Sequence, residues 1–252
     1  MTTTFVLISV SDRVDALNEL LDSIRFRPAF KHYHVSLLFQ DPDGVADRIR
    51  HRDRIANFFI VPEKLGCHGA RVELLRRIRY DSYVNLDDDV ELTEHTHYQP
   101  AIDKAMEPGT GFVLTNWART RSLLDKKVRS MRHEFIRQAL VYQGGGMCYR
   151  DEIADLMREL PVCHQTFDTA WPLTAYLAGY QSYRYLGSLA IHRVCSRGGM
   201  NAYMSERPPE TMLEQYVTFR RAKRITGTGM DLLIPLDKDL TPLAKETHAR
   251  NR

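Results

Sequence analysis

The chain has 252 residues, of which 43% are hydrophobic and 10% aromatic, and its formal net charge at pH 7 is only +3. A chain of this kind buries a substantial core, and α/β enzymes of this length are often single domains. The apolar run at residues 5–10 is too short for a bilayer span or a signal peptide, and no longer apolar run follows it. We therefore expect a cytoplasmic protein that does not contact a membrane. If the protein is of viral origin, we expect it in the host cytoplasm.

Strand-like and helix-like segments alternate through the first third of the chain. Residues 5–10 form an apolar run that is typical of a strand covered on both faces. From residue 14 to residue 24 apolar residues recur at helical spacing, and Asp12 stands where it can cap this helix. We also predict strands at residues 35–39, 58–61 and 83–86, and a helix after the glycines at positions 66 and 69.

The predicted strand at residues 83–86 runs directly into three consecutive aspartates, residues 87–89. Strands that alternate with helices at this interval indicate a doubly wound, mostly parallel sheet flanked by helices. Ligands in such sheets bind at the carboxyl ends of the strands. Because Asp12, Asp41 and the aspartate triplet all follow strands, we expect them on one rim of the sheet.

The remainder of the chain contains fewer regular patterns. We predict one α/β domain over residues 1–197, with halves at 1–92 and 93–197. Residues 198–252 then form a C-terminal extension with one helix and a polar tail. The elements predicted after the triplet are a helix at 98–106, a strand at 111–117, a basic segment at 119–133, the glycines Gly144, Gly145 and Gly146, helices at 151–160 and 168–179, and a strand at 189–192.

The triplet of Asp87, Asp88 and Asp89 is the strongest chemical signal in the sequence. Adjacent carboxylates repel one another, and a divalent cation offsets that repulsion directly. A metal held beside a sheet serves as a Lewis acid for a diphosphate leaving group, because it neutralises charge that builds up as the bond breaks. A helix N-cap with surplus surface acids is the alternative interpretation.

The order of these features resembles the nucleotide-sugar half of GT-A fold glycosyltransferases, especially the large family 2 group. The motifs that carry the resemblance are Ser-Asp-Arg at 11–13, Asp41 at a strand end, residues 66–71, and Tyr-Val-Asn-Leu-Asp-Asp-Asp at 83–89. Residues 167–180 resemble the acidic motif that opens a helix ending in glycine and an aromatic residue. Residues 189–192 resemble the strand that ends in a metal-binding histidine. The resemblance covers residues 1–195.

The resemblance implies a Rossmann-like GT-A domain that transfers a sugar from a nucleotide diphosphate sugar, with a UDP-sugar as the main candidate. Residues 1–92 would be its nucleotide-sugar half and residues 93–197 its acceptor half. Asp87, Asp89 and His192 would bind a metal, and a mixed oxygen and imidazole set suits Mn²⁺ at least as well as Mg²⁺. A core histidine at 192 and a solvated helix face at Arg71 are the alternatives. The residues expected to contact the nucleotide sugar are Ser11, Asp12, Arg13, Asp41, Arg71, Asp87 and Asp88.

On the acceptor side, the resemblance makes Asp168 the candidate general base. In an inverting transfer a carboxylate opposite the diphosphate takes the proton of the attacking hydroxyl. The family usually places Glu before this Asp, whereas Phe167 stands there. A helix N-cap is the alternative role for Asp168. The other residues proposed to contact the acceptor are Trp117, Gly144, Gly145, Gly146 and Trp171, although core packing is the alternative for each tryptophan.

The basic segment at residues 119–133 bears on the identity of the acceptor. It holds seven cationic or potentially cationic side chains against one acid, which suggests a polyanionic acceptor. Phage and kinetoplastid enzymes of this fold glycosylate hydroxymethylated bases in DNA, so we expect DNA contacts from Lys126, Lys127 and Arg129. A glycan or small-molecule acceptor with a solvated charged helix is the alternative. Two other functional classes, a metal-dependent nucleotidyltransferase and a non-catalytic nucleotide-sugar binder, stay open.

Overall fold

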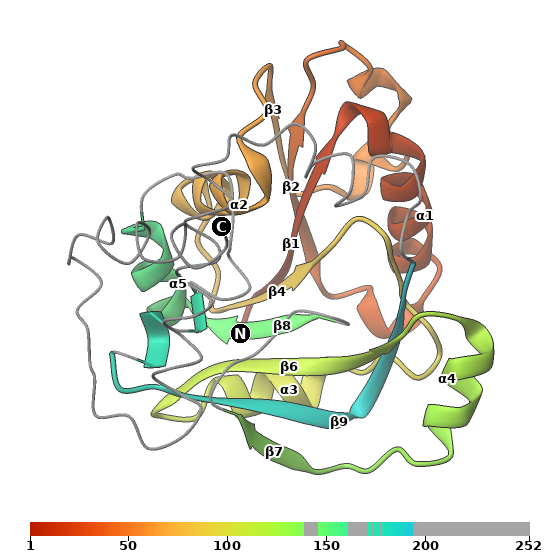
Figure 1. Cartoon of the computed structure of the whole chain (residues 1–252). Coiled ribbons are helices and arrows are strands. Elements are labelled where there is room, and N and C mark those ends of the chain that lie inside the picture. The colour runs from red at the N-terminus through yellow and green to blue at the C-terminus, as the bar shows by residue number, and fades with distance from the viewer. Residues whose placement is uncertain (139–145, 161–170, 173, 177, 194–252) are drawn as a thin grey trace, which may run out of the picture.

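The computed structural model describes residues 1–138, 146–160, 171–172, 174–176 and 178–193 (Figure 1). The predicted residues Asp168, Gly144 and Gly145 and the C-terminal extension lie outside this part of the chain. The strands are β1 (Thr3–Val10), β2 (His34–Gln40), β3 (Asn57–Val61), β4 (Ser82–Leu86), β5 (Val90–Glu91), β6 (Thr110–Ala118), β7 (Phe135–Gln138), β8 (Met147–Arg150) and β9 (Gln181–His192). The α-helices are α1 (Val14–Arg25), α2 (Gly66–Arg77), α3 (Gln99–Ala105), α4 (Arg121–Val128) and α5 (Asp151–Arg158).

The nine described strands form one sheet in the order β3-β2-β1-β4-β8-β6-β9-β5, with β7 also paired to β9. Strands β1, β2, β3 and β4 are parallel to one another. β8 runs antiparallel to β4 and β6, β6 is parallel to β9, and β5 and β7 run antiparallel to β9. Six strands therefore share one direction and three oppose it, which confirms the predicted α/β class with a mostly parallel sheet.

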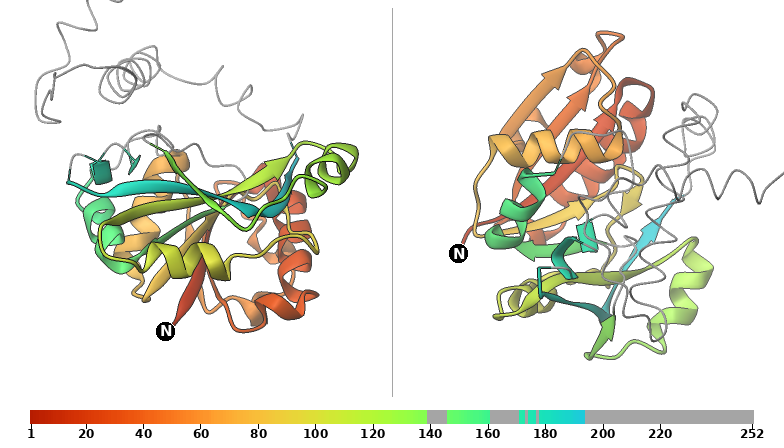
Figure 2. Two further views of the ribbon diagram at one scale, coloured as in Figure 1. Left: turned by 90° about the horizontal axis from the view of Figure 1, so that it is seen from below. Right: turned by 60° about the vertical axis from the view of Figure 1, so that its left-hand side comes forward.

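Helices cover both faces of this sheet (Figure 2). Alternate residues of β1 point to opposite faces, as the period of a strand requires. Phe5 and Leu7 pack in one cluster with residues of α1 and α3. Val6 and Ile8 pack in a second cluster with residues of α2 and α5. The apolar run predicted as a strand covered on both faces is thus buried between two helical layers.

Two expectations about local structure were wrong, and one strand was not predicted. Asp12 does not cap α1, because it lies with an exposed side chain in a 3-10 turn, Ser11–Arg13, and the N-cap position belongs to Arg13. The helix predicted to follow the glycines at positions 66 and 69 begins earlier, at Gly66 itself. No element was predicted directly after Gly146, where Met147–Arg150 pairs with β4 and β6 as strand β8.

Gly146 precedes β8 and lies directly against the ring of Tyr98. Its φ is +149°, and a Cβ built on it would stand 2.6 Å from Cε1 of Tyr98. The Tyr98 side chain is itself buried, so it has little room to move. The close backbone approach predicted for this glycine is therefore made to a core aromatic ring.

We predict that Gly146→Ala lowers the free energy of unfolding by about 1 to 3 kcal/mol more than Gly109→Ala, as measured by urea denaturation. Gly109 also has a positive φ, +76°, but a Cβ there would meet nothing within 4 Å. It thus reports the backbone cost alone, about 1 kcal/mol. Equal losses in the two variants would contradict a steric role for the Tyr98 ring.

Candidate functional site

The aspartate triplet lies at the carboxyl edge of the parallel strands. In the pairing of β1 with β4, Leu7 is opposite Leu86, so the turn after β4 lies beside the last residues of β1. The Oγ of Ser9 in β1 donates a hydrogen bond of 2.6 Å to Oδ2 of Asp88. Ser9 was not predicted as a site residue, although it is the one polar residue in the apolar run at residues 5–10.

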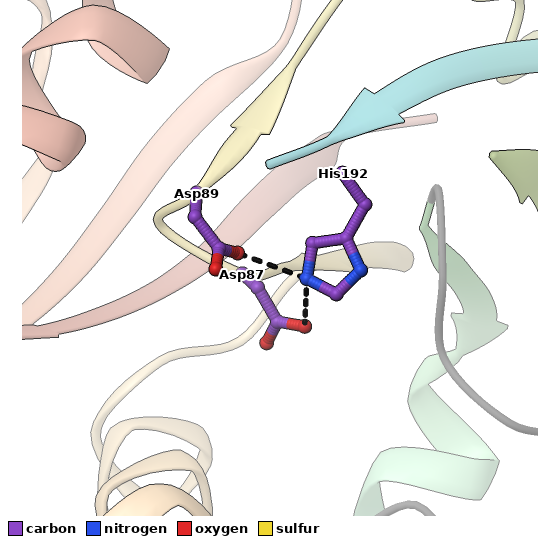
Figure 3. Close-up of side chains that lie close together, drawn as sticks. All are labelled: Asp87, Asp89 and His192. Carbon is purple, nitrogen blue, oxygen red and sulfur yellow. Dashed lines mark ion pairs between the residues drawn. The ribbon is translucent and has the colours of Figure 1, made fainter. Parts of the chain in front are cut away.

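A tight turn and a short strand bring His192 to the triplet. The backbone N–H of Val90 donates to the carbonyl of Asp87 at 3.2 Å, which closes the turn between β4 and β5. β5 then pairs with the end of β9, with Val90 opposite His192. As a result, Nε2 of His192 lies 3.0 Å from Oδ1 of Asp89 and 3.9 Å from Oδ2 of Asp87 (Figure 3). The structure thus gathers the three residues proposed as metal ligands.

Two arginines complete the charge balance of the triplet. Arg13 ends the 3-10 turn after β1, and its guanidinium lies 2.7 Å from Oδ1 of Asp88 and 2.9 Å from Oδ2 of Asp89. Arg71 on α2 lies 2.6 Å from Oδ1 of Asp87, with its side chain fully buried. Arg71 was expected to meet the diphosphate, and the structure places its guanidinium on an aspartate of the triplet. Each of the three aspartates therefore has a cationic partner.

The pKa values at the site follow from burial and from these pairs. Burial raises the pKa of Asp88 to about 6, even though Arg13 and the Ser9 hydroxyl oppose the shift. Burial alone would also raise the pKa of Asp89, but the His192 ring and Arg13 outweigh it and lower that pKa. Burial alone would lower the pKa of His192, but Asp89 and Asp87 outweigh it and raise that pKa. The negative charge of Asp89 therefore faces a ring that its neighbours favour as a cation.

The chemistry of this cluster fits a divalent cation. Asp87, Asp89 and His192 each offer one ligand atom, and these atoms lie within 4.8 Å of one another. Within the described residues, the buried Oδ1 of Asp89 accepts no hydrogen bond of good geometry, and it forms an ion pair with Nε2 of His192 at 3.0 Å. Two carboxylate oxygens and an imidazole nitrogen are ligands that first-row divalent metals accept. A cation between these atoms would satisfy the oxygen and offset the repulsion between the carboxylates.

The residues predicted to contact the nucleotide lie along the same edge, but several have structural roles. The two carboxylate oxygens of Asp41 accept hydrogen bonds of 2.8 Å from the backbone N–H groups of Val45 and Ala46. Ser11 donates to the carboxylate of Asp43. Asp41 therefore fixes the turn after β2, which shapes this end of the sheet next to β1.

Trp117 connects the metal cluster to the basic segment. It lies near the end of β6, and its ring meets the His192 ring edge-on, with centroids 5.2 Å apart and planes at 84°. Arg119 and Lys127 each place their charge 5.8 Å from the centroid of the indole. Lys127 also donates to the carbonyl of Trp117 at 2.6 Å. A half-buried aromatic face beside the metal cluster thus carries two cations.

Trp171, in contrast, belongs to the core. Its side chain is fully buried and stacks against Phe112, with centroids 6.3 Å apart, and lies edge-on to Tyr149. Such contacts are those of core packing, the alternative that the sequence left open for this residue.

A network of ion pairs supports the strand that carries His192. Glu91 in β5 accepts from Arg121 of α4 and lies 2.5 Å from a guanidinium nitrogen of Arg193. Arg193 also pairs with Glu19 of α1, and its backbone N–H donates to the carbonyl of Asp89 at 2.9 Å. This network was not predicted, although Arg193 directly follows the proposed histidine ligand.

A cleft of about 570 Å³ opens between α1 and β5, on the flank of the triplet. Arg27 and Arg193 are the cationic residues among its described lining. Carboxylates predominate there, so the cleft repels the phosphates of a nucleotide sugar. The acidic residues of the lining are Glu19, Asp22, Asp88, Asp89 and Glu91.

Solved glycosyltransferases share this architecture. PcManGT, a mannosyltransferase from Pyrobaculum calidifontis in complex with GDP-Man and Mn²⁺, matches with a TM-score of 0.63 and 17% identity over 98% of this chain and 68% of its own. TarS 1-349 from S. aureus matches with a TM-score of 0.59 and 14% identity, over 91% of this chain and 67% of its own. GalNAc-T7 with UDP, GalNAc and Mn²⁺ matches with a TM-score of 0.66 and 14% identity, over 99% of this chain and 55% of its own. The chain has the GT-A fold.

This result confirms the fold that the strand order and the aspartate triplet indicated. The chain spans about two thirds of the length of the first two structures and 55% of the third. No protein-family model matches the sequence, and no curated protein sequence matches it. Within the described part of the chain, the helices are too short or too polar to cross a bilayer.

We predict that Glu91→Gln lowers the free energy of unfolding by about 1.5 kcal/mol, because two guanidinium groups lose a charged acceptor that is only 16% exposed. Glu73→Gln is the matched control, because Glu73 forms a single ion pair with Arg77 one helical turn away. That loss should be about 0.3 to 0.5 kcal/mol. Chemical denaturation measures both values, and equal losses would mean that the Glu91 network adds nothing to an ordinary surface pair.

Proposed function

We propose that this chain is a metal-dependent glycosyltransferase that moves a hexosyl or pentosyl group from a UDP-sugar to an acceptor hydroxyl. The observation that carries the proposal is the cluster of Asp87, Asp89 and His192 at the carboxyl edge of a GT-A sheet. Similar structures contain GDP-Man with Mn²⁺, UDP with GalNAc and Mn²⁺, and, in TarS, UDP-GlcNAc. The nucleotide sugars and Mn²⁺ in those structures support a metal-dependent transfer from a nucleotide sugar at this cluster.

The proposed reaction assigns distinct roles to the residues of the site. Asp87, Asp89 and His192 would hold the metal, with Mn²⁺ favoured by the imidazole and Mg²⁺ as the alternative. When bound, the cation would supply positive charge to the diphosphate leaving group. Ser11, Asp12 and Asp41 line the donor edge of the sheet. Asp168 removes the proton from the acceptor hydroxyl, a role proposed from its sequence motif.

We predict that, in a thermal-shift screen with Mn²⁺, a UDP-sugar raises the melting temperature most among nucleotide sugars. A ligand at 100 times its Kd adds about 2.7 kcal/mol to the stability of the folded state. Asp89→Ala should abolish the metal-dependent part of the shift, because it removes a ligand oxygen. Asp47→Ala, which removes an almost fully exposed carboxylate, is the control and should keep the shift. An unchanged metal response in Asp89→Ala would exclude Asp89 from the site.

Product analysis separates the proposal from the two other classes. Sugar transfer or slow donor hydrolysis releases a nucleoside diphosphate, whereas a nucleotidyltransferase releases pyrophosphate from a triphosphate. Tight nucleotide-sugar binding without turnover across many acceptors would identify a non-catalytic binder.

The cations on and beside α4 are an argument for a polyanionic acceptor. In the described chain, Arg121 and Arg132 of the basic segment form ion pairs with acids, and Lys127 donates to the carbonyl of Trp117. Through Trp117 this surface is continuous with the metal cluster. Because phosphate contacts dominate binding to nucleic acids, we propose a hydroxymethylated base in DNA as the acceptor, with a glycan or small molecule as the alternative. The exposed cations of the segment that form no ion pair with an acid in the described chain are Arg119, Lys126, Lys127 and Arg129.

We predict that binding to duplex DNA weakens steeply with salt. Changing Lys126, Lys127 and Arg129 together to glutamine should reduce the slope of log K against log salt by about 2 to 3, because three phosphate contacts are lost. Fluorescence anisotropy over a salt series measures the slope. The charge-matched control changes Arg48, Arg50 and Arg54, which are exposed on another part of the surface. Absent or salt-independent binding by the unmodified protein would favour the glycan or small-molecule acceptor.

A further inference from the structure

The two carboxylates proposed as metal ligands share one arrangement of their oxygens. In Asp89, Oδ2 lies 2.9 Å from Arg13 and Oδ1 lies 3.0 Å from Nε2 of His192. In Asp87, Oδ1 lies 2.6 Å from Arg71 and Oδ2 lies 3.9 Å from the same histidine nitrogen. Each carboxylate therefore has one oxygen on an arginine and the other directed towards His192.

Asp88 differs from its two neighbours, because neither of its oxygens faces the histidine. Its Oδ1 lies 2.7 Å from Arg13 and its Oδ2 accepts from the Ser9 hydroxyl at 2.6 Å. The side chain is 4% exposed. A carboxylate that is buried and paired in this way is suited to hold Arg13 in place. The triplet thus contains two candidate metal ligands, Asp87 and Asp89, and one carboxylate that holds Arg13.

Arg71 is held as firmly as Arg13. Its side chain has no exposed area, and its second terminal nitrogen lies 2.5 Å from Sγ of Cys67, one turn earlier on α2. The nitrogen that contacts Asp87 also lies 3.4 Å from the carbonyl of Leu86. A guanidinium enclosed between α2 and β4 sets the rotation of the Asp87 carboxylate, because the planar fork has a fixed geometry.

We infer that Arg13 and Arg71 are positioning residues that turn the Asp89 and Asp87 carboxylates so that each presents one oxygen to the metal. This inference rests on the proposed function of the site. Without the arginines, repulsion between the adjacent carboxylates would separate them, and each would be free to rotate. Groups that orient metal ligands typically contribute a factor of about 10 to 100 in metal affinity. The inference also replaces the expected contact of Arg71 with the diphosphate.

The two roles for the arginines predict different measurements. A positioning arginine changes the affinity for Mn²⁺ alone, with no nucleotide present. An arginine that binds the diphosphate changes the affinity for UDP in the absence of metal and leaves the affinity for Mn²⁺ unchanged.

The test is a titration with Mn²⁺ alone, followed by electron paramagnetic resonance, which reports free Mn²⁺. We expect Arg13→Met and Arg71→Met each to raise the Kd for Mn²⁺ by about 10- to 100-fold. Arg13→Lys should fall between Arg13→Met and the unmodified protein, because it keeps the charge and loses the fork. Asp88→Asn should shift in the same direction as Arg13→Met, because Arg13 loses its anchor.

Arg150→Met is the control, since Arg150 is also largely buried and ion-paired, but with Glu152 outside the site. Its Kd for Mn²⁺ should equal that of the unmodified protein. Circular dichroism verifies folding, and if Arg71→Met does not fold, the partly exposed Arg13 carries the test. A folded Arg13→Met variant with an unchanged Kd for Mn²⁺ would overturn the inference and leave the proposed function standing. No Mn²⁺ binding by the unmodified protein would overturn the proposed function together with it.

Discussion

Three adjacent carboxylates at the end of a buried strand repel one another, and at this sheet edge the repulsion is offset by side chains from distant parts of the chain. Arg13 arrives from the turn after β1, Arg71 from α2 and His192 from the end of β9. β9 ends at His192, far along the chain from β4, which ends at Leu86, so the contacts of the triplet join segments that are distant in sequence. The position of His192 depends in turn on the short pairing of β5 with β9.

The same constraint explains why the surroundings of the triplet differ from one side to the other. Asp88 points towards β1, where Ser9 and Arg13 hold it, whereas Asp87 and Asp89 point towards His192. The turn between β4 and β5 makes this division possible, because it changes the direction of the chain within the triplet. Three identical side chains in a row thus have different partners, and the pKa of Asp88 is raised whereas that of Asp89 is lowered.

The sequence predicted the parallel half of the sheet well, because its strands are long apolar runs separated by amphipathic helices. It also predicted the grouping of residues 87–89 with His192, through the resemblance of two separate motifs. β5 has only two residues and β8 follows a glycine cluster, so neither produces a periodic pattern. Their existence depends on pairing with partners that are distant in sequence, which no local pattern reveals.

The roles of individual side chains were harder to predict than the position of the site. An arginine on a helix reads equally well as solvated or as a phosphate ligand, and only the packing of α2 on β4 shows that Arg71 is buried against Asp87. Likewise, the environment of Trp171 is set by Phe112 and Tyr149, which lie on strands from other parts of the chain. Sequence spacing identifies which residues can meet at a sheet edge, but not which oxygen faces which cation.

The charges around the triplet also differ between its two sides. On the α1 side of the triplet, the cleft is lined mainly by carboxylates, and Arg193 joins Glu19 to Glu91 across it. On the His192 side, Trp117 carries Arg119 and Lys127 over its ring. The first surface repels a diphosphate and the second attracts it. Under the proposed function, the donor phosphates and an anionic acceptor would therefore both approach the face where the proposed metal ligands converge.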